Sequence, residues 1–354
     1  MNRGRLPQAA AWAEGSVQGR PASRVRPSDP GWPSEANWDR LKREVGGRLI
    51  TPQSPLSACR DAPGSALARA VLQRLRNPYS IGEQPGLTQT SGWVGAWTSQ
   101  PSAYVVVART TEDLVAAVTF ARENNLRLVV KGGGHSYQGT SNAADSLLVW
   151  TREMHAVTVH AALVASGCAH VHAPQPAGTI AAGAQWRAAY QAVTTRAGRD
   201  VQGGGCATVG VAGLIRSGGF GSFSKNDGLA AAALLEAEIV TADGAVLIAN
   251  ACTNADLFWG IKGGGGGSLG IVTRRTLRTR ELPLFGSASS TDTAASGSGP
   301  AGLALREHLA MCGEGPYTVA FTATRGVEAH MLDLARVHGA RLDLVDHSRT
   351  PSLT

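Results

Sequence analysis

Apolar positions become regularly spaced from about residue 100 and predict alternating strands and helices. The β-branched run AYVVVA at 103–108 is typical of a buried strand. A helix capped by Thr111 is predicted next, because apolar residues recur at i, i+3, i+4 and i+7, at Leu114, Ala117, Val118 and Ala121. An Asn-Asn pair ends this helix, and residues 126–130 form a second strand. The unit closes on the glycine-rich segment KGGGHS at 131–136, where backbone N–H groups can converge on a phosphate.

The rest of the central region continues this mixture of elements. Ala242-Asp243-Gly244 separates two apolar runs and is a strong hairpin signal. Strands are predicted at 146–150, 156–160, 179–183, 234–241, 245–250 and 271–277. Helices are predicted at 38–45, 66–76, 186–196 and 209–215, with a further one that Thr253 or Asn254 caps and that runs to Ile261. The expected fold class is therefore α+β, with strands in the majority.

The two ends of the chain lack such patterning. Residues 1–36 are rich in Pro, Gly, Ser and Arg, and we expect a disordered leader. Residues 286–300, GSASSTDTAASGSGP, have the composition of a linker. Beyond them the pattern predicts one strand at 317–321 and one helix at 328–337, and no further β-rich domain. The predicted organisation is a leader, an N-terminal segment at 37–98, one domain at 99–283 and a linker with a degenerate or truncated C-terminal segment at 284–354.

Glycine is over-represented and clustered. The chain has 44 Gly among 354 residues, and they gather in runs at 132–134, 203–205 and 263–267. No period of three runs through them, so a collagen-like protein is excluded. Clustered glycine instead indicates backbone that lies close to a ligand or turns sharply. No apolar run reaches the length of about 18 residues that a membrane span needs, so we expect no membrane partner.

The charge and the cysteine content exclude further classes of protein. The formal charge is +7, and residues 1–50 contribute +4 of it. No stripe of basic and aromatic residues occurs elsewhere, so a nucleic-acid partner is not expected. Five widely spaced cysteines without a C-x-x-C pair predict neither a disulfide scaffold nor a zinc site. Because no apolar signal stretch follows the N-terminus, we expect a cytoplasmic protein.

The third glycine run resembles a dinucleotide fingerprint only in its letters. Residues 265–270 match G-x-G-x-x-G. That motif requires a preceding strand and a following helix, whereas here a predicted helix precedes it and a predicted strand follows it. We therefore assign no Rossmann site.

Two side chains beside the other glycine runs carry candidate chemistry. His135 follows three glycines at a strand end, and its imidazole could act as a base, a ligand or a nucleophile, although a loop histidine more often only donates hydrogen bonds. Cys206 follows Gly203-Gly204-Gly205 and precedes a predicted helix, whose N-terminus lowers a thiol pKa. A single cysteine is usually a small core residue, and we interpret the other four as structural.

Four ordered motifs resemble a known family. They are KGGGHSYQGTS, VQGGGCATVGVAGLIRSGGFGSFSKNDGLAA, LLEAEIVTADG and DLFWGIKGGGGGSLGIVTRRTL. Together they resemble the berberine bridge enzyme-like flavoproteins of the vanillyl-alcohol oxidase superfamily, which have a PCMH-type FAD-binding domain built from two α/β subdomains. The resemblance covers residues 95–283 well and 38–94 more loosely.

The resemblance implies an FAD that is covalently attached at two points. The family's matching histidine and cysteine bond to the 8α-methyl and C6 of the isoalloxazine, which here implicates His135 and Cys206. The residues expected to cradle the pyrophosphate are Gly132, Gly133, Gly134, Ser136 and Gly139. Those expected to line the flavin and its ribityl chain are Gly210, Gly213, Gly218, Gly219 and Ser222, while Gly270, Ile271 and Val272 are expected against the adenine or the ring. Such attachment raises the flavin potential and fixes the ring for hydride transfer.

The C-terminal part departs from the family pattern. Family members continue into a substrate domain that carries the catalytic Tyr or Glu base, and most of that domain is missing from this sequence. No catalytic base is assigned, since Tyr317 and Glu314 would be guesses. We expect an FAD-dependent oxidoreductase that moves a hydride from a C–H or CH–OH group of a small-molecule substrate to flavin N5, with reoxidation by O2. The alternative is a truncated flavin-binding remnant without turnover.

Overall fold

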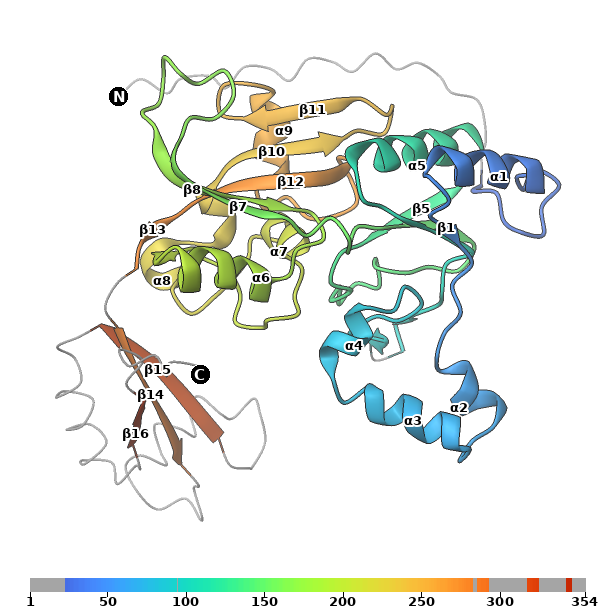
Figure 1. The fold of residues 1–354 in the computed structure, drawn as a ribbon, viewed down its shortest axis with the longest axis horizontal. Coiled ribbons are helices and arrows are strands. Elements are labelled where there is room, and N and C mark those ends of the chain that lie inside the picture. Colours follow the sequence, from blue (N-terminus) through green and yellow to red (C-terminus); the bar gives the residue numbers. More distant parts are fainter. Residues whose placement is uncertain (1–22, 94, 283–284, 293–316, 325–341, 346–354) are drawn as a thin grey trace, which may run out of the picture.

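The computed structural model describes residues 23–93, 95–282, 285–292, 317–324 and 342–345. Two sheets dominate it, one of four strands in the order β1-β4-β6-β5 and one of five strands in the order β11-β10-β12-β8-β7 (Figure 1). Their helices pack beside them, so the predicted α+β class is confirmed. The His135 loop extends from the first sheet, and Cys206 lies in a loop of the second subdomain.

The first subdomain is built around three parallel strands. They are β4 (Tyr104–Val107), β6 (Ser146–Trp150) and β5 (Arg127–Lys131), with β1 (Leu49–Ile50) antiparallel at the edge. Helices α1 (Glu35–Glu44) and α5 (Thr111–Glu123) pack against them, and the Trp38 ring stacks on Tyr104 at 4.0 Å between centroids.

The cap of α5 lies one residue before the predicted one. The Thr110 hydroxyl accepts from the Asp113 backbone N–H, while the Asp113 carboxylate accepts from the Thr110 N–H. This capping box fixes the helix start at Thr111, because Asp113 stands three residues after Thr110.

The second subdomain is an antiparallel sheet covered by helices. Its strands are β7 (Val157–Leu163), β8 (Gln175–Ala181), β10 (Leu234–Val240), β11 (Val246–Asn250) and β12 (Ile271–Arg278). One core unites a face of this sheet with α6 (Trp186–Tyr190), the π-helix η1 (Gln191–Arg196), α7 (Val211–Arg216) and α9 (Ala255–Ile261). The helix predicted at 186–196 is thus continuous, but its second half is a π-helix.

Short elements complete the described chain. They are α2 (Ser57–Asp61), α3 (Ala66–Arg74), α4 (Pro78–Gly82), β2 (Gly92–Trp93), β3 (Trp97–Thr98), β9 (Arg199–Asp200), α8 (Ser224–Asp227), the 3-10 helix η2 (Ala230–Ala233) and β13 (Arg280–Glu281). The segment that carries α2, α3 and α4 lies between β1 and β2 in the sequence, and its end contacts β5 and the following loop through the Lys131–Leu87 and Gln89–Gly134 hydrogen bonds (Figure 1).

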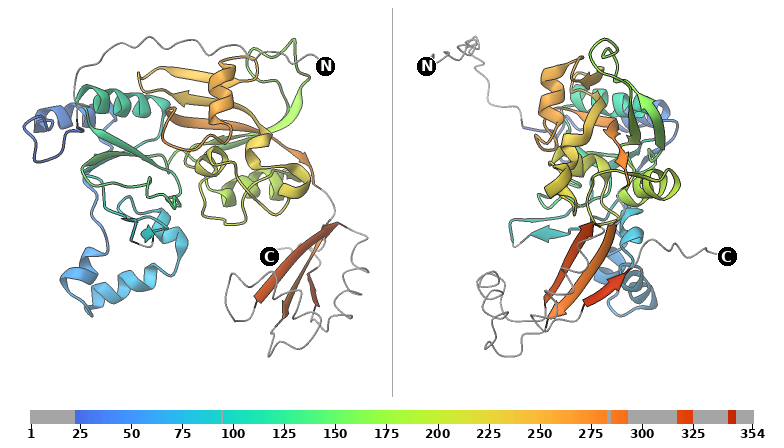
Figure 2. Two further views of the ribbon diagram at one scale, coloured as in Figure 1. Left: turned by 180° about the vertical axis from the view of Figure 1, so that it is seen from behind. Right: turned by 90° about the vertical axis from the view of Figure 1, so that its left-hand side faces the viewer.

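The structure corrects two expectations at the ends of the chain. Residues 23–36 are not a disordered leader, because Val25 bridges Leu126 in parallel and Ser34 caps α1. Residues 286–292 are not a linker, because β14 (Phe285–Asp292) pairs with β15 (Tyr317–Thr324) and β16 (Leu342–Val345) in a separate sheet, apart from the main body in Figure 2. Small and hydroxylated residues suffice there, because backbone hydrogen bonds hold the ladder. The helix predicted at 328–337, with Glu314 and Cys312, lies outside the described residues.

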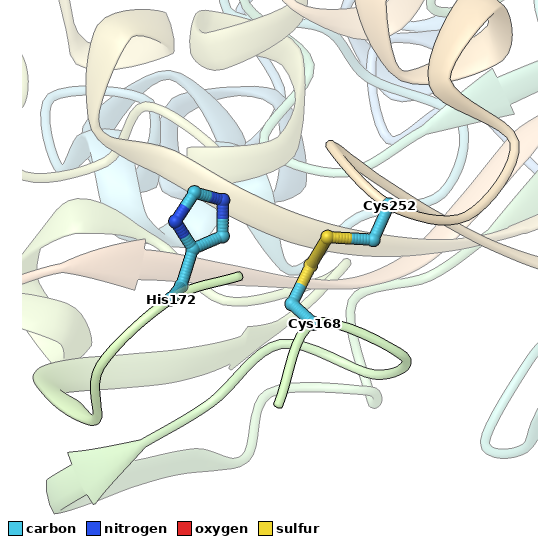
Figure 3. A group of neighbouring side chains, drawn as sticks. All are labelled: Cys168, His172 and Cys252. Carbon is cyan, nitrogen blue, oxygen red and sulfur yellow. A yellow bond between two sulfur atoms is a disulfide. The ribbon is translucent and has the colours of Figure 1, made fainter. Parts of the chain in front are cut away.

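A disulfide that the cysteine spacing did not predict joins Cys168 to Cys252 (Figure 3). The two residues are 84 apart in sequence, but the loop after β7 and the turn after β11 meet at one end of the sheet. Since β7 and β11 are the two edge strands, the bond ties the edges together. Asn250 supports it by donating to the Ser166 carbonyl and to the Glu236 carboxylate, both at 2.9 Å.

His172 lies beside the disulfide, but both sulfur atoms are already bonded to each other (Figure 3). The trio therefore offers no thiolate to a metal. None of the helices described is both long enough and apolar enough to cross a membrane.

Candidate functional site

The loop that carries His135 is anchored by a buried lysine. Lys131 ends β5 with only 1% of its surface exposed, and its ammonium donates to the carbonyls of Gln84 at 2.9 Å, Pro85 at 2.5 Å and Leu87 at 2.9 Å. Burial lowers the pKa of Lys131 to about 7. The N-terminal segment is thereby held against the start of the glycine-rich loop.

The first glycine run touches the segment that follows the second run. A Cβ placed on Gly133 would lie 2.6 Å from the backbone nitrogen of Gly210 and 2.8 Å from the Thr208 carbonyl oxygen. Only glycine permits that approach. The contact brings the loop after β5 onto the segment that leads into α7, although about 75 residues separate them in sequence.

This contact places His135 and Cys206 around one hydroxyl. Nε2 of His135 lies 2.9 Å from Oγ1 of Thr208, and Sγ of Cys206 lies 3.5 Å from the same oxygen. Thr208 is buried, His135 is half-buried, and Cys206 is exposed with a free thiol. Burial lowers the pKa of His135, and a hydrogen bond to Thr208 opposes that shift in part. The lowered pKa favours the neutral imidazole, which is the form that a nucleophile or metal-free base needs.

The third glycine run joins the site through Arg216. Helix α7 starts after Gly210 and ends at Arg216, whose Nη1 donates to the Gly270 carbonyl at 2.7 Å and whose Nε donates to the Gly265 carbonyl at 3.1 Å. Helix α9 precedes this run and β12 follows it, which confirms the context that excluded a Rossmann fingerprint. One short helix thus connects Gly210, which touches the first glycine run, to the third run.

The predicted cradle residues lie in these same segments. Those in the loop between β5 and β6 are Gly132, Gly133, Gly134, Ser136 and Gly139, and those in or beside α7 are Gly210, Gly213, Gly218, Gly219 and Ser222. Gly270 directly precedes β12, where the side chains of Ile271 and Val272 are buried in the two hydrophobic cores. Only the backbone of these two residues is therefore available to contact the adenine or the flavin ring. The ligand contacts of all these residues stay predictions.

The surface beside Cys206 fits a flat cofactor. A Cβ on Gly205 or Gly213 would meet no atom within 4 Å, and both residues are exposed. A planar ring can therefore approach this backbone without displacing a side chain. The donor set of a neutral imidazole, a free thiol and a shared hydroxyl is suited to bonding an electrophilic ring at two points.

No sequence motif indicated a role for Thr208. The sequence shows only a hydroxyl side chain two positions after Cys206, and its role becomes visible from the contact with His135 in the fold. Lys131 was likewise missed, because a lysine at a strand end is usually exposed.

Comparison with known proteins identifies the domain. Residues 101–250 match the family described as FAD binding domain. The FAD-linked oxidoreductase easE of Arthroderma otae is 36% identical over 280 residues, which is 72% of this chain and 45% of that protein. The chain thus spans about half the length of the curated relatives it matches.

Two solved structures share the fold. A VAO-type flavoprotein from Myceliophthora thermophila aligns with a TM-score of 0.76 and 27% identity, over 91% of this chain and 65% of that one. Glucooligosaccharide oxidase from Acremonium strictum, which carries a 6-S-cysteinyl, 8α-N1-histidyl FAD, aligns with a TM-score of 0.57 and 24% identity, over 69% and 53%. Residues 101–250 therefore form an FAD-binding domain, and the chain is related to FAD-linked oxidoreductases and shares the fold of VAO-type flavoproteins.

Proposed function

We propose that the chain binds FAD covalently through His135 and Cys206 and takes a hydride from a C–H or CH–OH group of a small molecule, with O2 as the final acceptor. In each attachment a bond to the His135 nitrogen or the Cys206 sulfur would replace a C–H bond of the flavin, with the protons released and the two electrons passed to O2. The observation that carries this proposal is the Thr208 hydroxyl within hydrogen-bonding distance of both side chains. The four motifs of the berberine bridge enzyme-like group support it further. When bound, the flavin supplies the electron sink for the hydride.

His135 is prepared to act as a nucleophile. Its lowered pKa keeps a nitrogen lone pair available at neutral pH, since protonation would occupy both ring nitrogens. The Thr208 hydroxyl hydrogen-bonds to Nε2 and fixes the ring plane, while Gly133 and Gly210 fix the loop. His135 therefore meets a bound ring in a single orientation.

Cys206 supplies the second attachment from the opposite loop. Its thiol is free and exposed, so a ring lying on Gly205 and Gly213 could reach it. The Thr208 hydroxyl can accept a hydrogen bond from the S–H group or donate one to the sulfur. Glucooligosaccharide oxidase carries this pair of linkages, and the same pair is proposed for this chain.

A flavin-binding remnant without turnover is the second candidate. The chain spans about half the length of its curated relatives, and that is the observation in its favour. Neither of the weak candidates for a catalytic base strengthens the case for turnover, because Tyr317 opens β15 in the separate sheet and Glu314 lies outside the described residues.

Intact-protein mass after denaturation tests the cofactor and its linkage together. The full chain loaded with FAD should retain one FAD adduct, which His135→Ala or Cys206→Ala alone should preserve and the double variant should lose. Cys59→Ala is the matched control, since that thiol is free but distant from the glycine loops in sequence and fold. Release of all flavin from the unmodified chain would overturn the covalent proposal.

Anaerobic mixing separates the oxidoreductase from the remnant. Bleaching of the flavin absorbance by any member of a panel of alcohols, oligosaccharides and amines, followed by recovery in air, supports turnover with O2. A flavin that dithionite reduces but no organic compound does supports the remnant.

A further inference from the structure

Two arginines are buried near the third glycine run. Arg275 lies in β12 with 1% of its surface exposed, and Arg216 ends α7 with 7% exposed. Burial lowers the pKa of Arg275, and the nearby charge of Arg216 lowers it further. Two like charges therefore share one buried region.

Arg275 has no hydrogen-bond partner among the described residues. Its Nε, Nη1 and Nη2 are all buried and unsatisfied. Its cross-strand neighbours are Ala237 on β10 and Ile180 on β8, both buried and apolar. Arg216 is satisfied only in part, because its Nη2 is also buried without a partner.

Burying both guanidinium groups without partners costs folding free energy unless an anion binds to them. A buried charge that lacks both a counterion and hydrogen bonds costs several kcal/mol. None of the ion pairs found in the described part of the chain includes Arg216 or Arg275. Burial lowers the pKa of Arg275 to about 9, so the side chain still carries its charge at neutral pH.

We propose that Arg216 and Arg275 form a buried binding site for an anionic group of the flavin cofactor. This inference rests on the proposed function. The site lies within reach of the His135 loop, because Gly210, which touches that loop, directly precedes α7, and the six residues of α7 span about 9 Å. Arg216 also donates to the carbonyl of Gly265 in the third glycine run and to that of Gly270 just before β12.

FAD offers two anionic groups of this kind, its diphosphate and its ring once reduced. Both present oxygen or nitrogen acceptors to a guanidinium, and Arg pairs with such anions through two parallel hydrogen bonds. The two sources make different predictions, because riboflavin lacks the diphosphate but has the same ring.

The test compares Arg275→Leu with Arg274→Leu. Arg274 is the adjacent residue of β12, is exposed and pairs with Glu238, so its loss removes the same charge outside the core. Both changes are made in the full chain that also carries His135→Ala and Cys206→Ala, so that flavin binding is reversible. Dissociation constants are measured for FAD and riboflavin, along with the affinity of the bound flavin for sulfite, which reports on stabilisation of negative charge on the ring.

Arg275→Leu should weaken FAD binding about tenfold with riboflavin unchanged if the diphosphate is the anion. It should weaken sulfite binding about tenfold with FAD binding unchanged if the ring is the anion. Arg274→Leu should change the affinities for FAD, riboflavin and sulfite by less than about twofold. Since Leu suits the apolar surroundings, the Arg275 variant should fold, and Arg216→Met provides a second test.

Unchanged FAD, riboflavin and sulfite affinities in Arg275→Leu and Arg216→Met would overturn the arginine site while leaving the proposed function intact. A parent chain that binds neither flavin would overturn both.

Discussion

Nε2 of His135 and Oγ1 of Thr208 lie 2.9 Å apart across two loops that are 73 positions apart in sequence. The hydroxyl therefore positions the imidazole from the loop that also carries Cys206. This relationship makes Thr208 the residue on which both proposed attachments depend.

Thr208→Val should slow covalent FAD attachment about fivefold while the protein remains folded, because one hydrogen bond contributes about 1 kcal/mol to orienting the ring. The measurement is the time course of the adduct mass after FAD is added to the apoprotein. Thr179→Val is the control, since Thr179 also lies 2.9 Å from a histidine Nε2, that of His160, on β7 and away from the glycine loops. Equal attachment rates in both variants would exclude a positioning role for Thr208.

Lys131 should make stability rise with pH between about 7 and 10.5. In the folded protein burial lowers its pKa to about 7, whereas the unfolded chain keeps the ordinary value of 10.5. The unfolded state therefore binds more protons in that window, and the free energy of unfolding increases by up to about 1.4 kcal/mol per pH unit. Urea unfolding at pH 7.5 and 8.5, each compared with Lys131→Met, isolates this effect. A pH-independent difference between the two proteins would show that Lys131 keeps its proton when folded.

Loss of the Cys168–Cys252 disulfide should lower the free energy of unfolding by about 4 kcal/mol, because the bond closes a loop of about 84 residues. Urea unfolding of Cys168→Ser and Cys252→Ser, compared with Cys59→Ser, measures this loss. Non-reducing peptide mapping shows whether the bond forms. Disulfides are rare in cytosolic proteins, so its presence in protein from the natural host would favour an oxidising compartment over the cytoplasm.

Gly213→Ala should separate ligand binding from folding. The position is exposed and open within α7, where alanine is favoured over glycine by about 1 kcal/mol. The apoprotein should therefore be as stable as the parent or more so, while FAD binding weakens if the ring lies on this backbone. Thermal melting with and without FAD gives both values. Gly133→Ala is the contrasting change, since its Cβ would collide with backbone and destabilise the apoprotein itself.

Local signals in the sequence determined most of the secondary structure. The strand at 146–150 has the predicted bounds, and the hairpin at 242–244 joins β10 to β11 as expected. The linker predicted at 286–300 is wrong over residues 286–292. Ser and Thr are compatible with a strand once a partner strand pairs with it. The four motifs, with His135 and Cys206 inside them, also carried the assignment to an FAD-binding fold.

Only the tertiary structure decided which distant groups meet. It joined Cys168 to Cys252, brought Thr208 to His135 and left Arg275 unpaired beside Arg216. None of these relationships follows from spacing or composition, because each depends on how two sheets and their loops pack in space. A local pattern reports the preferences of neighbouring residues, whereas burial and contact between segments tens of residues apart arise from the packed fold.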